Sequence, residues 1–207
     1  MLDFFDDQLD PDWEIYVQPF VNGLRPDFVL LNPAIGIAVF EVKDWDLDAQ
    51  EYRPDDRVGW LRVRDPRTKE IYLKRSPFNQ AEQYGKEIHD IYCPRLGEGA
   101  NFRVLTRGVI FTRASTEQAR TLCQPELTRF SPAALRHVPV SGDDALHAGA
   151  LSTVFPESER TSSLLMGEEL ADDMRRWLVE PQHAVEQRVA LAMDARQRQF
   201  ASTRTDS

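Results

Sequence analysis

Two apolar segments of strand length, separated by a short turn, constrain this chain more than any other feature. Residues 28–31 read Phe-Val-Leu-Leu and residues 37–40 read Ile-Ala-Val-Phe. The intervening segment contains Pro and Gly, the residue types that most often interrupt regular structure. The pattern predicts two adjacent antiparallel strands, partly buried on both faces. A hairpin centred on Ala34 places Val29 opposite Val39.

Charged residues gather at the open end of this predicted hairpin. Continuing the register places Asp27 opposite Glu41, and Lys43 shares their face because side chains alternate along a strand. Two opposed carboxylates destabilise a sheet, and their burial costs free energy unless a partner compensates. A divalent cation would supply this compensation, since Mg²⁺ takes one or two carboxylates and keeps several waters. The alternative is an ordinary surface ion pair at a strand end.

A helix is predicted to begin at Pro77, because proline is well suited to the first helical turn. Apolar residues then recur at helical spacing and predict a stripe that packs on the sheet: Phe78, Ala81, Tyr84, Ile88 and Ile91. Gln80 lies near the start of the adjoining polar face. Its amide is a candidate for orienting water or contacting phosphate, and the helix pattern alone is equally compatible with a solvated helix flank.

Three short elements carry a resemblance to a known family. They are Pro26-Asp27, then Glu41-Val42-Lys43, then the helix start Ser76-Pro77-Phe78-Asn79-Gln80. Together they resemble the PD-(D/E)XK nuclease superfamily and, within it, the nuclease-related domain called NERD. The last element is similar to that family's Asn-Pro-x-x-Gln, with Ser in place of Asn. The resemblance covers roughly residues 10–115 and rests on strand placement as well as on spacing.

The resemblance implies hydrolysis of a nucleic-acid phosphodiester with Mg²⁺ or Mn²⁺. Asp27 and Glu41 would be metal ligands, and the backbone carbonyl of Val42 would complete the protein's share. Lys43 would hold or help deprotonate the attacking water and offset charge on the phosphate. Gln80 would be an auxiliary catalytic residue.

The charge distribution bears on nucleic-acid binding in two ways. The net charge of −9, from 25 basic and 34 acidic residues, opposes strong autonomous DNA binding, because affinity comes mainly from phosphate neutralisation. Residues 53–75, however, carry eight bases against four acids and read as a second hairpin. We expect Arg62, Arg64, Lys74 and Arg75 to follow a DNA backbone. For each of these, a solvated strand face is the alternative.

A second, shorter resemblance lies near the C-terminus. Residues 191–200 read Leu-x-x-Asp-x-x-Gln-x-x-Phe, which resembles the Q motif that precedes the Walker A loop of superfamily I helicases. Gln197 would then bind adenine in a full-length helicase, and the chain is expected to be the front piece of a nuclease–helicase fusion. An ordinary solvated helix is the alternative.

These observations predict an α/β protein with a restriction-endonuclease-like mixed β-sheet core flanked by helices. Residues 1–155 would form the nuclease domain and residues 156–207 a C-terminal helical connector. The expected function is that of a metal-dependent deoxyribonuclease coupled to a helicase in DNA processing, repair or defence. A non-catalytic nucleic-acid or protein docking module that keeps the fold is the alternative, and the oligomeric state stays open.

The cellular setting is also predicted from composition. No apolar run approaches membrane-spanning length, and the acidic N-terminus is unlike a signal peptide, so we expect a cytoplasmic protein without a membrane partner. Cys93 and Cys123 have no zinc-type spacing and are expected to be reduced.

Overall fold

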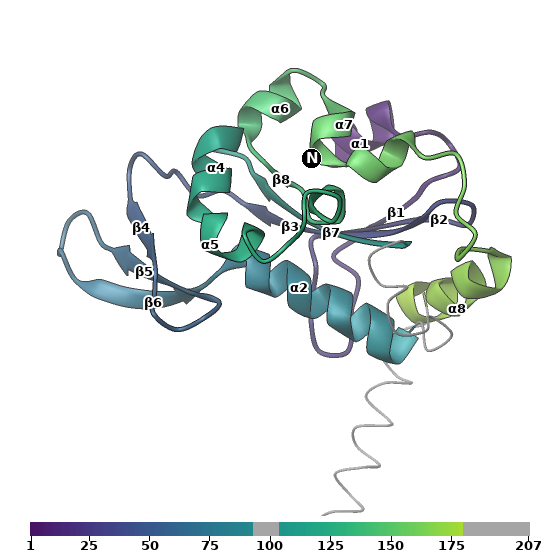
Figure 1. The fold of residues 1–207 in the computed structure, drawn as a ribbon, viewed down its shortest axis with the longest axis horizontal. Helices are drawn as coiled ribbons and strands as arrows, with labels where there is room; N and C mark the ends of the chain where they lie inside the picture. The colour runs from purple at the N-terminus through teal and green to yellow at the C-terminus, as the bar shows by residue number, and fades with distance from the viewer. Residues whose placement is uncertain (93–103, 180–207) are drawn as a thin grey trace, which may run out of the picture.

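The computed structural model describes residues 1–92 and 104–179, and its centre is a mixed five-stranded sheet, here called the main sheet (Figure 1). Its strands follow the order β1 (Glu14–Val17), β2 (Phe28–Asn32), β3 (Gly36–Lys43), β7 (Leu105–Phe111) and β8 (Val140–Ser141). Strand β2 pairs antiparallel with both β1 and β3, whereas β3, β7 and β8 are parallel. The predicted α/β class with a mixed sheet is confirmed.

The predicted β2–β3 hairpin is also confirmed, with Val29 opposite Val39. The side chain of Asn32 fixes its turn, because Oδ1 accepts hydrogen bonds from the N–H groups of Ala34 at 2.9 Å and Ile35 at 3.2 Å. An Asn side chain that binds nearby backbone in this way mimics a turn of the main chain. The turn therefore helps to set the register that positions the end of β3.

A second, three-stranded antiparallel sheet projects from one end of the molecule (Figure 1). This small sheet consists of β4 (Glu51–Pro54), β5 (Trp60–Arg64) and β6 (Ile71–Arg75). The β5–β6 pair is the predicted second hairpin, and its turn is closed by Asp65, whose Oδ1 accepts 2.8 Å hydrogen bonds from the N–H groups of Arg67 and Thr68. Strand β4 was not predicted.

Helices cover both faces of the main sheet (Figure 1). They are α1 (Leu2–Gln8), α2 (Pro77–Glu87), η1 (Ile88–Tyr92), α4 (Thr116–Leu122), α5 (Gln124–Leu127), η2 (Leu135–His137), α6 (Asp143–His147), α7 (Leu151–Val154), η3 (Pro156–Glu159) and α8 (Glu168–Val179). Helices α2 and α8 lie on one face, and α1, α6 and α7 lie on the other. No helix in residues 1–92 and 104–179 is long and apolar enough to span a membrane.

The face of the main sheet that α2 and α8 cover carries one hydrophobic cluster. Its members come from β2, β3, β7, α2, η1 and α8 and include Ile37, Val39, Tyr84, Ile88, Leu170 and Met174. The described part of the predicted connector, residues 156–179, therefore packs on the same core as the hairpin. Residues 180–207, including Gln197, lie outside the described residues, so the helicase-like motif stays a prediction. Cys93 also lies outside the described residues.

On the opposite face, the ring of Phe40 occupies the centre of an aromatic cluster. It packs against Phe5 at 5.3 Å and Phe155 at 5.6 Å between ring centroids, and it is fully buried. Gly108 on β7 lies directly beside it, and a Cβ atom added there would meet the Phe40 ring at 2.1 Å. The absence of a side chain at residue 108 thus makes room for the ring.

We predict that Gly108→Ala lowers the free energy of unfolding by about 1–3 kcal/mol, the usual cost of overpacking a well-filled core. Gly167→Ala is the matched control, because no atom lies within 4 Å of the added methyl group. Chemical denaturation measures both variants. Equal stability of Gly108→Ala and wild type would show that the aromatic cluster is less tightly packed than described.

Candidate functional site

The end of β3 brings together the residues that the sequence singled out. The Val42 N–H donates a 2.8 Å hydrogen bond to Oδ2 of Asp27, which ties the Asp27 carboxylate to the edge of β3. The ammonium of Lys43 forms an ion pair with Oε1 of Glu41. Asp27, Glu41 and Lys43 therefore converge, as the hairpin register predicts.

The backbone carbonyl oxygen of Val42 is directed to the same side of β3 as the Asp27 carboxylate. The Lys43 carbonyl accepts a 2.8 Å hydrogen bond from the Thr112 N–H on the β7 side. Successive residues of a strand direct their backbone N–H and C=O groups to opposite neighbouring strands. Lys43 bonds on the β7 side, so the N–H and C=O groups of Val42 point toward β2. Continuing the register places Pro26 opposite Val42. Proline has no N–H to donate, so the ladder supplies no donor for the Val42 carbonyl.

Glu41 is the most unusual residue of the group, because only 5% of its surface is exposed. Its Oε2 atom is buried without a hydrogen-bond partner among the described residues. Burial raises the pKa of the Glu41 carboxyl above its ordinary value, and the charge of Asp27 adds to this, whereas Lys43 and Tyr84 lower it. A buried acceptor that lacks a donor costs about 1–3 kcal/mol. A cation bound beside Asp27 would remove this cost.

Tyr84 belongs to the site, although the sequence indicated only a packing role for it. It is 6% exposed, and its hydroxyl interacts with the Glu41 carboxylate without reaching full hydrogen-bond geometry. Burial, followed by the negative charge of Glu41, raises the pKa of the Tyr84 hydroxyl. Gln80 lies one helical turn earlier on α2 and is half-buried. Residues four apart share a helix face, so Gln80 and Tyr84 lie on the same face of α2. This spacing from Gln80 is the sequence signal that could have assigned Tyr84 to the site.

The four basic residues predicted to bind DNA divide between the two faces of the small sheet. Arg75 pairs with Trp60 across the β5–β6 ladder and therefore shares the outer face with Arg62 and Arg64. Lys74 pairs with the buried Leu61 and faces the protein core. The four side chains thus do not form one continuous basic stripe.

The outer-face arginines have partners within the described chain. Arg62 pairs with Asp55 and Asp56, and Arg64 lies 3.6 Å from Glu51. The Arg75 Nε donates a 3.3 Å hydrogen bond to Asn79. Acidic neighbours therefore offset part of the positive charge on this face.

Lys74 instead lies over the ring of Trp45, with its ammonium nitrogen 4.2 Å from the ring centroid. Trp45 stacks on Tyr52 of β4 at 4.7 Å between centroids and an interplanar angle of 9°. The Lys43 ammonium lies 5.7 Å from the same Trp45 ring. The small sheet thus delivers a second lysine close to the end of β3.

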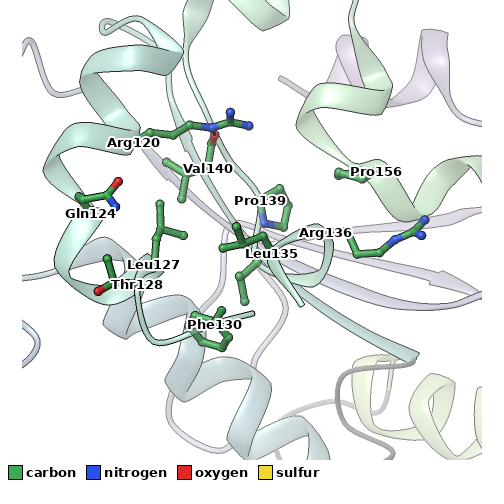
Figure 2. Close-up of a pocket in the computed structure, with 11 residues that line it drawn as sticks. Arg120, Gln124, Leu127, Thr128, Phe130, Leu135, Arg136, Pro139, Val140 and Pro156 are labelled. Carbon is green, nitrogen blue, oxygen red and sulfur yellow. Dashed lines mark hydrogen bonds between the residues drawn. The ribbon is translucent and has the colours of Figure 1, made fainter. Parts of the chain in front are cut away.

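A pocket of about 440 Å³ lies elsewhere, against β8, α4, α5 and η2, and shares no lining residue with the Asp27 site (Figure 2). Its apolar wall includes Leu127, Phe130 and Leu135. The two arginines at the pocket are engaged, because Arg120 donates to the Val140 carbonyl and Arg136 pairs with Glu157. None of the residues that line this pocket is a carboxylate or a lysine.

Within residues 1–92 and 104–179, no three His, Cys, Asp or Glu side chains gather as a ready metal cluster. The protein's share of a metal site at the end of β3 would therefore be two carboxylates and one carbonyl, which suits a cation that keeps water ligands. Cys123 is a buried free cysteine. In comparisons with known proteins, no family model, curated protein or solved structure matches this chain.

Proposed function

We propose that this protein is a nuclease that hydrolyses DNA phosphodiester bonds with Mg²⁺ or Mn²⁺. The observation that carries the proposal is the buried Oε2 of Glu41, which has no hydrogen-bond partner in the part of the chain that the structure describes, beside the Asp27 carboxylate and the Lys43 ammonium. A carboxylate pair held in this way is poorly compensated by the protein alone, and hard divalent cations prefer oxygen ligands of this kind.

The assignment to the PD-(D/E)XK superfamily, with a NERD-like domain, is part of the same proposal. It is supported by the mixed sheet, in which the antiparallel β2–β3 hairpin carries the carboxylates and the parallel strand β7 follows through α2. The resemblance predicts a mixed β-sheet core flanked by helices, and this arrangement agrees with that expectation. The short elements at residues 26–27, 41–43 and 76–80 fall at the open end of the hairpin and at the start of α2.

Each residue has a distinct chemical task in this proposal. Asp27, Glu41 and the Val42 carbonyl would hold the cation, which when bound lowers the pKa of a coordinated water and offsets charge on the phosphate. The Lys43 ammonium donates hydrogen bonds to the attacking water and to the phosphate oxygen as negative charge builds there. Gln80, on the α2 face that Tyr84 shares, orients the water or contacts the phosphate.

The negative net charge of the chain bears on how a DNA substrate would reach the site. An acidic chain with a net charge of −9 binds DNA weakly by itself, since affinity depends on phosphate neutralisation. A helicase domain, fused downstream as the motif around Gln197 suggests, would bring single-stranded or forked DNA to the end of β3. The coupling to DNA repair or defence belongs to this proposal.

We predict that Mg²⁺ or Mn²⁺ raises the melting temperature of the protein, because a ligand that binds only the folded state stabilises it. At a concentration of about 100 times Kd the gain is about 2.7 kcal/mol, or roughly 5–10 °C for a domain of this size. Asp27→Ala and Glu41→Gln should abolish the rise. Asp27→Ala should also lower the metal-free melting temperature, since the Val42 N–H loses its acceptor.

Differential scanning fluorimetry with MgCl₂, MnCl₂ or EDTA measures these shifts. Asp7→Ala is the control, because Asp7 is an exposed carboxylate on α1, remote in sequence from the hairpin. A metal response that persists unchanged in Asp27→Ala would place the cation elsewhere.

We predict that Lys43→Met reduces DNA cleavage by about 100-fold to 10,000-fold while preserving the metal-induced rise in melting temperature. The ammonium acts on the water and the transition state, so its loss should lower kcat more than metal affinity. Gln80→Ala should cause a smaller loss, and the exposed Lys86→Met should cleave as wild type does. Nicking of plasmid and single-stranded DNA in MgCl₂ is the assay. Equal cleavage by wild type and Lys43→Met would refute the assignment of Lys43.

A further inference from the structure

Two lysines from different sheets approach the same tryptophan ring. The ammonium nitrogen of Lys74 lies 4.2 Å from the Trp45 centroid and that of Lys43 lies 5.7 Å from it. Attraction between a cation and an aromatic face explains how each lysine is placed. It does not cancel the repulsion between the two positive charges.

The two lysines differ in how their charges are compensated. Lys43 forms an ion pair with Glu41, whereas Lys74 has no carboxylate within ion-pair distance in residues 1–92 and 104–179. Burial lowers the pKa of Lys74, the charge of Lys43 lowers it further, and nearby Asp44 opposes both effects. Among the described residues, the site thus combines an acceptor without a hydrogen-bond donor, Oε2 of Glu41, with an ammonium that has no ion-paired carboxylate, that of Lys74.

The orientation of Lys74 is fixed by the fold. Its partner across the ladder, Leu61, is 1% exposed, so the Lys74 side chain leaves β6 on the inner face of the small sheet. Trp45, which supports it, is buried to 7% exposure and stacked on Tyr52. A lysine held against a rigid aromatic pair loses less conformational entropy on binding a ligand than a free surface lysine does.

We propose that Lys74, supported by Trp45, binds a phosphate group of the nucleic-acid substrate next to the phosphate that Lys43 acts on. The ammonium offers three N–H donors and a point charge to a phosphodiester oxygen. The inference rests on the proposed function, because it takes the ligand at the end of β3 to be a nucleic acid. It separates Lys74 from Arg62 and Arg64, which lie on the outer face of the small sheet and pair with carboxylates there.

The test is binding of a short fluorescein-labelled single-stranded DNA, measured by fluorescence anisotropy in CaCl₂ and in EDTA over a series of salt concentrations. Lys74→Met should raise Kd about threefold to tenfold at low salt, and the slope of log Kd against log salt should fall by about 0.7, the loss of one phosphate contact. Lys74→Arg should retain most of the affinity. Lys69→Met, at the tip of the β5–β6 turn, is the exposed control.

Melting temperatures in EDTA and in MnCl₂ accompany the titrations, and Lys74→Met should show the wild-type metal response. Lys74→Met with wild-type Kd and slope would overturn the proposal, as would wild-type protein that fails to bind the DNA under every condition. The nuclease proposal fails separately, if wild type shows neither cleavage nor metal stabilisation. In that case, loss of DNA affinity in EDTA on Lys74→Met still supports the role of Lys74.

Discussion

The register of the β2–β3 hairpin is the constraint on which the rest of the structure depends. Because side chains alternate with period two, a slip of one residue would exchange the two faces of β3. Val39 would then leave the cluster under α2, Phe40 would lose its place beside Gly108, and Glu41 would turn away from Tyr84. The same register that fills the hydrophobic clusters on the two faces of β3 thus also places the carboxylates.

A second buried carboxylate shows what is unusual about Glu41. Glu157 is also 5% exposed, yet Arg136 and Arg160 both pair with it. Two guanidinium groups compensate that charge within the protein, as stable buried carboxylates require. Glu41 has one ammonium as counter-charge and Asp27 as a neighbour of the same charge. The contrast between these two glutamates is the physical reason for proposing a cation at the end of β3.

Much of this arrangement follows from local patterns in the sequence. The apolar runs and the turn residue Asn32 specify the hairpin, and Pro77 with the apolar stripe specifies α2. Strand β4 escaped prediction because its four residues are mostly exposed and carry no alternation of buried residues. The partners of Arg62 and Arg64 were missed with it, since Glu51 lies on β4 and Asp55 directly follows that strand.

The placement of Arg62, Arg64 and Arg75 on one face of the small sheet and of Lys74 on the other was predictable in part. Adjacent residues of a strand point to opposite faces, so Lys74 and Arg75 could not both follow one DNA backbone on the same side of the small sheet. The placement of Lys74 over Trp45 was not predictable, because it depends on how the small sheet docks on the main sheet. The contact of Tyr84 with Glu41 was likewise not predictable, because the spacing of Tyr84 fits a packing stripe and Glu41 is distant from it in sequence.

The most direct test of the account is crystallographic location of Mn²⁺ by anomalous scattering in crystals of the protein soaked in MnCl₂. We expect an anomalous peak at the end of β3, within coordination distance of Asp27, Glu41 and the Val42 carbonyl. The same soak of Asp27→Ala crystals should lack that peak. An anomalous peak at another place, or none at the end of β3 in wild-type crystals, would contradict the claim that Glu41 is held there to bind a cation.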